Sequence, residues 1–252
     1  MVFQALILFN ALQQNVLNDD VLDVKGVKLP NFFKNNDLQW EFCHQFVELY
    51  QNYVLQTDGK LSYEMDDFCI SSDDIIFDCG ANAGLFAAYA ASKGAMVHCF
   101  EPCGSTRELL KQTQRLYPDN IIIYPYALSN KNGEATLCKT NNIGANHLNQ
   151  YDVNLANEVL QTETVLTTTI DNFVEQNNII PTFIKMDVEG AEFDAVQGAL
   201  KTLQKYSPKM VVGAYHTSNM MTKIKMLINN TLSGWAIIQK QENLFLYKKS
   251  KE

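Results

Sequence analysis

The stretch DIIFDCGANAGLFAAYAASKGAMVHCFEP, residues Asp74–Pro102, decides the fold of this 252-residue chain. Its first apolar run, Ile75–Phe77, has the length of a strand that is buried on both faces. A turn of small residues, Gly80–Gly84, leads into a helix-favouring segment over 85–93, and a second apolar strand follows over 96–100. Strand, glycine turn, helix and strand in this order predict one βαβ unit of a parallel sheet.

The turn of this unit lacks the glycines of a dinucleotide site. A nicotinamide or flavin cofactor requires the motif G-x-G-x-x-G, which lets the backbone approach a pyrophosphate at a helix N-terminus. Whether this motif is aligned on Gly80 or on Gly84, two of its three glycines are missing. The pattern therefore argues against a NAD-dependent oxidoreductase, which is the alternative enzyme class.

Acidic residues follow both strands of the unit, where ligands bind in open α/β sheets. Asp78 would repel a pyrophosphate, but it would attract the sulfonium and ammonium groups of S-adenosylmethionine. Glu101, about 20 residues beyond the turn, is placed to accept hydrogen bonds from two ribose hydroxyls. In a purely structural interpretation, the small residues only pack closely and Asp78 caps the helix. That interpretation does not explain why a second acid, Glu101, follows the next strand. The unit therefore predicts an S-adenosylmethionine site.

The composition is that of an ordinary globular protein, with 46% hydrophobic and 19% charged residues. The net charge of −8 argues against a nucleic-acid or anionic-membrane partner, because phosphate groups require a basic surface. The apolar N-terminus, residues 1–10, is too short to span a bilayer and lacks the basic region of a signal peptide. Six cysteines without a C-x-x-C pair favour free thiols and a cytoplasmic location.

The chain divides into two parts with different patterns of predicted secondary structure. Residues 1–60 predict a helical N-terminal extension, with a first helix over 5–17, a loop over 26–36, and a second helix that starts at Asn36 or Asp37. Residues 61–252 contain the organising unit and predict a single α/β domain.

Strands and helices continue to alternate after the organising unit. The remaining strands are predicted over 121–124, 134–138, 164–170, 183–190, 210–215, 235–239 and 244–247, and the one over 183–190 ends in acids. Helices are predicted over 105–117, 171–176 and 193–203, and through Ile224 and Leu227. Residues 139–163 are polar, rich in Asn and without a period, so they predict a long loop, and their position makes that loop a candidate substrate lid.

Three motifs of the chain resemble, in order and spacing, the hallmarks of the FkbM family of S-adenosylmethionine-dependent methyltransferases. They are Asp78–Gly84, Phe100–Pro102 and Ile184–Glu192, and the run Asp-Val-Glu-Gly-Ala-Glu in the last motif is the specific one. Two softer matches are Ala127–Gly133 and the pair Tyr215–His216. The resemblance covers roughly residues 61–250 and leaves residues 1–60 uncovered.

The resemblance implies a Rossmann-like, mostly parallel sheet of seven strands whose last strand is antiparallel. It implies that residues 61–252 are a methyltransferase domain with S-adenosyl-L-methionine as cofactor. The implied reaction is methylation of a hydroxyl on a sugar, a glycan or a small natural product. A non-catalytic scaffold with the same fold is the other alternative, and the acids at three strand ends argue against it.

The resemblance also implies which residues hold the cofactor. The glycine turn would line its methionine end, the acid after the second strand would hold the ribose, and two residues of the Ala-Leu-Ser match would lie near the adenine. The first acid at the end of the strand predicted from residue 183 would face the methyl group or the ammonium. In chain order these residues are Asp78, Gly80, Asn82, Gly84, Glu101, Ala127, Leu128 and Asp187.

Asp187, Glu189 and His216 are the candidate catalytic residues. Alignment of acceptor oxygen, methyl carbon and sulfur can supply about 7–11 kcal/mol of the barrier, and a base adds about 10²–10⁴-fold in rate. His216 follows the strand predicted over 210–215, and an ordinary imidazole pKa of about 6.5 would make it a neutral base or a positioning residue. Clustered carboxylates also suit Mg²⁺. The sequence shows no third ligand near Asp187 and Glu189, so we expect no metal.

Overall fold

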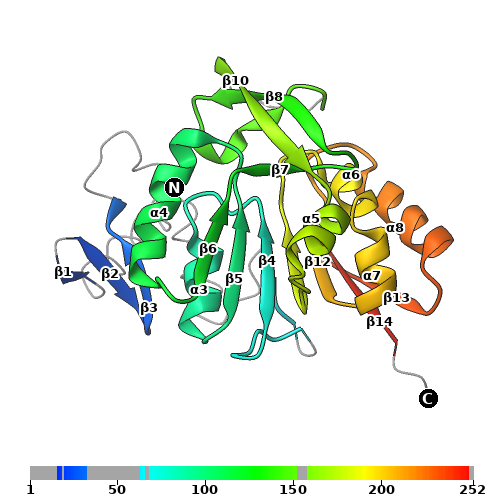
Figure 1. Ribbon diagram of the computed structural model, residues 1–252, viewed down its shortest axis with the longest axis horizontal. Coiled ribbons are helices and arrows are strands. Elements are labelled where there is room, and N and C mark those ends of the chain that lie inside the picture. Colours follow the sequence, from blue (N-terminus) through cyan, green and yellow to red (C-terminus); the bar gives the residue numbers. More distant parts are fainter. Residues whose placement is uncertain (1–15, 19, 33–62, 66–67, 152–157, 250–252) are drawn as a thin grey trace.

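The computed structural model describes residues 16–18, 20–32, 63–65, 68–151 and 158–249, and its centre is a seven-stranded sheet (Figure 1). The strand order is β13-β14-β12-β11-β4-β5-β6. β14 is antiparallel to both of its neighbours, and the other adjacent pairs are parallel. This confirms the predicted sheet. The strands are β4 (Ile75–Cys79), β5 (Met96–Phe100), β6 (Ile121–Tyr124), β11 (Phe183–Met186), β12 (Lys209–Gly213), β13 (Trp235–Lys240) and β14 (Asn243–Lys248).

Helices cover both faces of this sheet (Figure 1). Successive side chains of a strand point to opposite faces, so Ile76 of β4 packs on one side and Phe77 on the other. The helices on the side of Ile76 are α3 (Leu85–Ser92) and α4 (Gly104–Leu116). Those on the side of Phe77 are α5 (Ile170–Asn177), α6 (Glu192–Gln197), α7 (Leu200–Tyr206) and α8 (Met220–Thr231).

The helix predicted over 193–203 is two helices, α6 and α7. They are separated at Gly198 and Ala199. Gly198 lies so close to the loop after β7 (Tyr126–Leu128) that a Cβ atom would come within 2.2 Å of the carbonyl oxygen of Ser129. The break therefore lets the backbone of one layer approach the next, which the apolar period of the sequence does not reveal.

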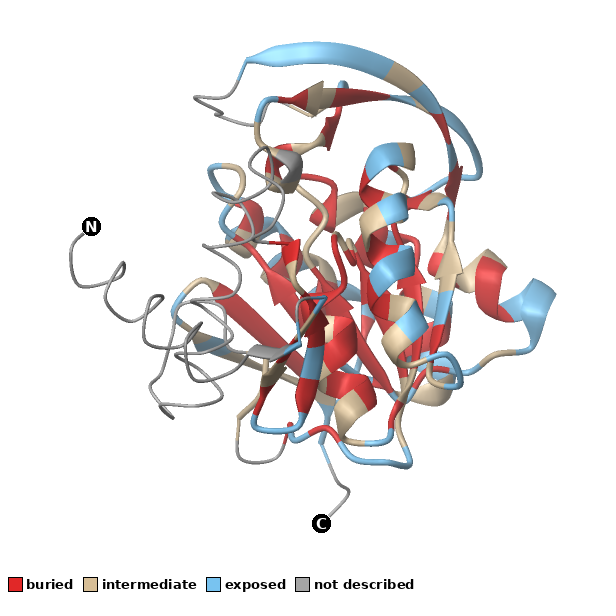
Figure 2. Ribbon diagram, turned by 90° about the vertical axis from the view of Figure 1, so that its left-hand side faces the viewer, coloured by how far each residue is buried: buried red, intermediate tan, exposed pale blue. Residues whose placement is uncertain are grey.

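A second, four-stranded sheet lies beyond the carboxyl ends of the parallel strands (Figure 1), in the order β7-β10-β8-β9. Its other members are β8 (Gly133–Thr140), β9 (His147–Leu148) and β10 (Val159–Thr168), with the 3₁₀ helix η3 (Ile143–Ala145) before β9. The predicted loop over 139–163 is therefore wrong, except that residues 152–157 lie outside the described part. Figure 2 shows why: β10 is exposed along its first half, so it has no alternation of apolar and polar residues. Pairing with β8, rather than a buried face, makes it a strand.

A third sheet, β1-β2-β3, precedes the α/β core in the chain. Its strands are β1 (Val16–Asn18), β2 (Val21–Val24) and β3 (Val27–Pro30), so the predicted helix through residue 17 and the predicted loop over 26–36 are wrong where the structure describes them. Lys25 and Gly26, with φ of 50° and 91°, form the two-residue hairpin turn between β2 and β3. Apolar residues of this hairpin pack on Leu85 and Ala88 of α3.

The second predicted helix of the N-terminal extension lies outside the described residues, and so does most of the first. The division of the chain at residue 60 therefore stays a prediction. Among the described residues, no helix has the length and apolar character needed to cross a membrane. The five cysteines of that part are free, as expected, and Cys43 lies outside it.

Candidate active site

Three strand ends meet at the turn after β4. The backbone N–H groups of Gly80 and Ala81 donate to the carbonyl of Phe100, at 3.0 and 3.1 Å, so the turn is attached to the end of β5. Gly80 has a φ of +79°, and a Cβ atom there would lie 1.8 Å from the carbonyl oxygen of Asp187, which follows β11. Gly84, with a φ of +89°, closes the turn immediately before α3. Glycine at position 80 is thus required by both the backbone angle and the lack of space.

Glu101 follows β5 directly and faces this turn. Its Oε2 accepts a hydrogen bond from the N–H of Asn82 at 3.0 Å, and its Oε1 accepts one from the N–H of Cys103 at 2.9 Å. Burial raises the pKa of Glu101 to about 7, against the opposing effect of these two N–H groups. Each carboxylate oxygen has two lone pairs, so each can accept one more hydrogen bond.

Asn82 adds a further acceptor to the turn. Its φ of 50° is left-handed, and its buried side-chain oxygen, Oδ1, has no hydrogen-bond partner among the described residues. A buried acceptor without a donor costs free energy unless a ligand or water supplies one. The turn and Glu101 therefore suit a ligand that brings hydroxyl or ammonium donors, and this donor chemistry fits S-adenosylmethionine better than a pyrophosphate.

Asp78 and Lys185 form a buried ion pair under the turn. They are partners in the register of β4 and β11, and both side chains are almost completely buried. Nζ of Lys185 lies 3.1 Å from Oδ1 of Asp78 and donates to the carbonyl of Gly80 at 2.9 Å. Burial raises the pKa of Asp78 above its ordinary value. Burial alone would lower the pKa of Lys185, but the charges of Asp78 and Asp187 outweigh it and raise that pKa.

Two tyrosines hold Asp187 at the end of β11. The hydroxyl of Tyr63 donates to Oδ2 of Asp187 at 2.8 Å. The hydroxyl of Tyr215 lies 3.2 Å from Oδ1 and 3.3 Å from Oδ2. Burial, followed by the charge of Asp187, raises the pKa of Tyr215 above its ordinary value, so this hydroxyl keeps its proton and remains a donor.

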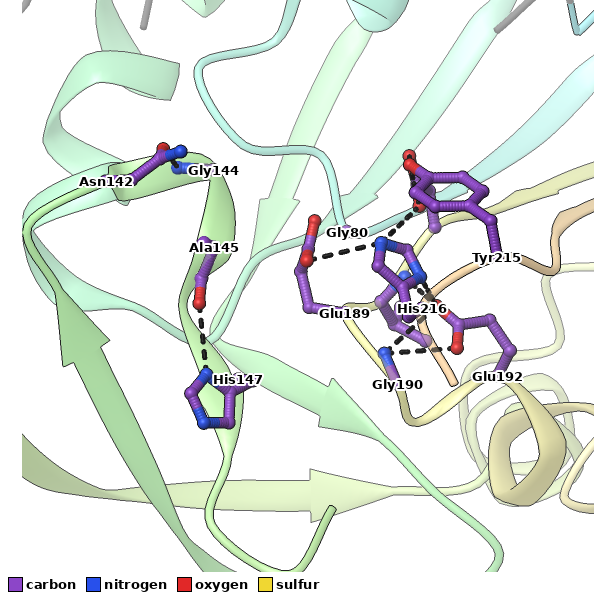
Figure 3. Close-up of polar contacts among 12 residues, drawn as sticks. Gly80, Asn142, Gly144, Ala145, His147, Glu189, Gly190, Glu192, Tyr215 and His216 are labelled. Atoms are coloured by element: carbon purple, nitrogen blue, oxygen red, sulfur yellow. Dashed lines mark hydrogen bonds and ion pairs between the residues drawn. The ribbon is translucent and has the colours of Figure 1, made fainter. Parts of the chain in front are cut away.

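His216 lies between two glutamates (Figure 3). Its Nε2 is 3.2 Å from Oε2 of Glu189 and 3.6 Å from Oδ1 of Asp187, and its Nδ1 is 2.9 Å from Oε1 of Glu192. The chain turns sharply at Glu189, which has a φ of 51°. Glu192 is fully buried at the start of α6 and accepts hydrogen bonds from the N–H groups of Val188 and Gly190.

The carboxylates around His216 change its ionisation. Burial alone would lower the pKa of His216, but Glu189, Glu192 and Asp187 outweigh it and raise that pKa to about 11. Burial also raises the pKa of Glu189 to about 7, against the effect of His216. The structure thus brings the three predicted catalytic residues together, and without a bound cation the carboxylates favour a protonated imidazole at neutral pH. This differs from the neutral imidazole expected from an ordinary pKa.

The sequence profile of the methyltransferase FkbM domain matches residues 78–232, more than half of the chain. The chain belongs to the FkbM methyltransferase family. A curated relative is the hexuronic acid methyltransferase AglP of Haloferax volcanii, which is 29% identical over 133 residues. The match covers 52% of this chain and 52% of AglP, so it spans about half the length of that relative.

A solved structure supports the fold of this FkbM domain. The crystal structure of methyltransferase FkbM from Methylobacillus flagellatus KT matches with a TM-score of 0.53 at 18% identity. The match covers 98% of this chain and 59% of that one. Together with the strand order described above, it confirms the Rossmann-like fold.

Two predicted cofactor residues of the FkbM domain, Ala127 and Leu128, lie on β7 rather than on the seven-stranded sheet. Both are buried. Ala127 packs with Leu137 and Leu148 in the core of the second sheet, and Leu128 belongs to the core beneath α5. Their place near an adenine stays a prediction.

Lys185 and Tyr63 are site residues that the motifs of the sequence did not place at the site. A lysine inside a strand that is buried on both faces requires a buried partner, so the position of Lys185 in the sequence already indicated a buried ion pair. From the sequence, Glu189 or Glu192 was the expected partner of the second ring nitrogen of His216, and the structure places Glu192 2.9 Å from Nδ1. Tyr63 lies outside every motif, and only the fold brings it to Asp187.

Proposed function

We propose that this chain is an S-adenosylmethionine-dependent O-methyltransferase whose acceptor is a hydroxyl of a sugar, in a glycan or a small molecule. The observation that carries the proposal is the arrangement at Glu101 and Asn82. A carboxylate held by two backbone N–H groups, beside a buried amide oxygen without a donor, meets the needs of a ribose and an ammonium group. The family and the relative AglP support both the reaction and the acceptor class.

In this proposal, residues at three strand ends contact different parts of the cofactor. Glu101 accepts hydrogen bonds from the ribose hydroxyls, and the turn from Gly80 to Gly84, with Asn82, encloses the methionine end. Ala127 and Leu128 bound the adenine. Asp78 acts through Lys185, because its carboxylate is buried against that lysine, and the lysine in turn holds the carbonyl of Gly80. Asp187 lies at the side of the turn where the acceptor enters.

S-adenosylmethionine supplies a methyl group on a sulfonium, whose carbon–sulfur bond pair stays on sulfur when the methyl leaves. The contribution of this chain is to orient the acceptor oxygen toward that methyl carbon, which can supply about 7–11 kcal/mol of the barrier. Asp187, Glu189 and His216 bind the acceptor hydroxyl, and the proton that the hydroxyl loses passes to this cluster. Alignment is the larger effect, since a base adds about 10²–10⁴-fold in rate.

The second sheet is placed to cover the acceptor. It lies beyond the carboxyl ends of the parallel strands, where ligands bind in α/β sheets (Figure 1). The hydroxyl of Tyr151, in the turn after β9, donates to Oδ2 of Asp194 at 2.8 Å, so the sheet is attached to α6 two residues after Glu192. We propose that this sheet, rather than a loop, forms the upper wall of the acceptor site.

Calorimetry with S-adenosylmethionine tests the cofactor half of the proposal. Glu101→Ala removes a charged acceptor of two hydroxyls, each such hydrogen bond being worth about 1.5–3 kcal/mol. We expect its affinity for S-adenosylmethionine to fall more than tenfold. Glu108→Ala, which removes an exposed glutamate on α4 that pairs with Lys111, is the matched control and should bind as the wild type does. Equal affinities for wild type and Glu101→Ala, or tighter binding of NAD, would contradict the proposal.

Turnover tests the acceptor half. Release of S-adenosylhomocysteine should be stimulated by oligosaccharides that contain a hexuronic acid, and the product should gain one O-methyl group by mass spectrometry. Binding of S-adenosylmethionine without turnover on any sugar would leave a cofactor-binding scaffold as the better description.

A further inference from the structure

Three acceptor atoms converge at the end of β11 and β12. Nε2 of His216 lies 3.2 Å from Oε2 of Glu189 and 3.6 Å from Oδ1 of Asp187, and one ligand atom from each of the three residues lies within 4.8 Å of the others. Carboxylate oxygens only accept hydrogen bonds, and so does an imidazole nitrogen without a proton. A proton on Nε2 or a cation must therefore lie among these atoms.

The spacing of the three atoms suits a metal ion. Adjacent ligands about 2.1 Å from an octahedral ion are about 3.0 Å apart, so the separations of 3.2 and 3.6 Å between Nε2 and the two carboxylate oxygens require only small shifts. Two carboxylate oxygens and one imidazole nitrogen form a mixed donor set for a divalent ion such as Mn²⁺. Three protein ligands also leave coordination positions open, as in catalytic metal sites.

The groups behind these ligands are arranged as in a metal site. A metal-binding histidine usually has a carboxylate at its other ring nitrogen, and Glu192 lies 2.9 Å from Nδ1 of His216. That nitrogen is buried, its contact with Glu192 is an ion-pair contact rather than a hydrogen bond, and the side chain of His216 is only 6% exposed. Tyr63 and Tyr215 orient Asp187 from its other side.

The charge of the cluster points the same way. Three carboxylates, those of Asp187, Glu189 and Glu192, surround one imidazole in a mostly buried place. The nearby cation of Lys185 is already paired with Asp78. Buried negative charge in excess of its partners costs free energy, and a divalent cation would compensate it.

We infer that Asp187, Glu189 and His216 bind one divalent metal ion whose open coordination positions face the acceptor. The binding of the ion does not depend on the proposed function, whereas its role does. In a methyltransferase the ion would hold the acceptor oxygen and favour loss of the hydroxyl proton. The inference replaces the expectation of no metal, which was based on the lack of a third ligand; His216, 27 positions beyond Glu189 in the chain, supplies it.

Electron paramagnetic resonance with Mn²⁺ tests the site directly, because free Mn²⁺ loses its six-line signal when it binds. The full chain without cofactor should show one saturable site. Glu189→Gln and His216→Gln should each weaken Mn²⁺ binding at least tenfold, and Glu192→Gln should weaken it about 10–100-fold. Glu108 lies on α4 and not in the cluster, so Glu108→Gln should leave Mn²⁺ binding unchanged.

Affinity for S-adenosylmethionine and far-ultraviolet circular dichroism, measured on the same variants, show that each is folded. If Glu189→Gln fails to fold, Glu189→Asp is the second variant. It keeps the charge, but its shorter side chain holds the carboxylate farther from the ion, so its Mn²⁺ affinity should also fall tenfold or more. Absence of saturable binding at millimolar Mn²⁺, or equal affinity in wild type and folded variants, would overturn the inference. Loss of S-adenosylmethionine binding in the wild type would overturn the proposed function alone.

Discussion

At the scale of single residues, the pair of Asp78 and Lys185 links the stability of the protein to its proposed chemistry. The two side chains face each other across β4 and β11, and Lys185 also holds the carbonyl of Gly80 in the glycine turn. A buried ion pair contributes little net free energy, but breaking it leaves a buried charge without a partner. Either single substitution should therefore damage both the sheet and the turn above it.

A double-mutant cycle in urea tests this pair. Asp78→Asn and Lys185→Met should each lower the free energy of unfolding by about 3–5 kcal/mol, because each leaves the other charge buried without its partner. The double variant should lose clearly less than the sum of the two losses. Additive losses would show that the two side chains do not depend on each other.

The sequence allowed the acids of the site to be predicted, but not their partners. Glu101 and Asp187 directly follow apolar strands, and His216 follows soon after another, so the rule that ligands bind at carboxyl ends of strands was enough to place them. Lys185 could not be matched to Asp78 without the register between two strands that are far apart in the chain. The high pKa of His216 likewise depends on Glu192, whose direction is set only by the turn before α6.

At the scale of elements, the glycine turn after β4 joins three strand ends. Gly80 and Gly234 have nearly the same backbone angle, with φ of +79° and +78°. A Cβ atom at Gly80 would meet the carbonyl oxygen of Asp187 at 1.8 Å, whereas one at Gly234 would meet nothing within 4 Å. The two positions therefore separate the cost of the angle from the cost of the contact.

Alanine at each of these glycines tests the contact. Gly234→Ala should lose about 1–2 kcal/mol of stability from the left-handed angle alone and bind S-adenosylmethionine as the wild type does. Gly80→Ala should lose more stability and at least tenfold in affinity, because the turn and the end of β11 must separate. Thermal unfolding and calorimetry measure the two effects. Similar losses in both variants would mean that the close approach to Asp187 has no consequence.

Elements with a clear hydrophobic pattern were predictable, and those set by pairing were not. The buried strands β4, β5, β6, β11 and β12 have short apolar runs, and the sequence places them within a few residues. β10 has polar residues on both faces and is ordered by β8, and β2 and β3 are short strands joined by a two-residue turn. In the exposed half of β10 the hydrogen-bonding partner, rather than a buried face, decides the conformation. β2 and β3 do bury apolar residues against α3, but each is too short for its period to stand out in the sequence.

At the scale of the whole molecule, an aromatic cluster on the side of α5 makes one contribution to the protein's response to acid. Phe77, Phe100, Tyr124 and Phe173 form edge and stacked contacts, and the ring of His98 stacks on Tyr124. Nδ1 of His98 lies 3.0 Å from the hydroxyl of Tyr124. Burial lowers the pKa of His98 to about 4.

Acid should destabilise the fold through His98. Its folded pKa lies below the ordinary unfolded value of about 6.5, so the unfolded chain binds the proton first and stability falls as pH drops from about 6.5 towards 4. His98→Phe should remove this part of the loss, on the order of 1 kcal/mol between pH 7 and 5 after screening by solvent. Tyr124→Phe removes the same contact but keeps the imidazole, so it should retain the pH dependence. Urea midpoints at the two pH values measure both, and an unchanged slope in His98→Phe would contradict the assignment.

The order of strands in the central sheet has a consequence for biosynthesis. β4 lies between β5, which follows it closely in the chain, and β11, whose neighbouring Thr182 comes 107 residues after Ile75. While the ribosome makes the intervening residues, β4, β5 and β6 can pair, but one edge of β4 stays open. Unpaired strand edges promote aggregation of nascent chains. We therefore expect ribosome-bound chains that end between β6 and β11 to need a chaperone, and chains that extend beyond β14 to be released from it.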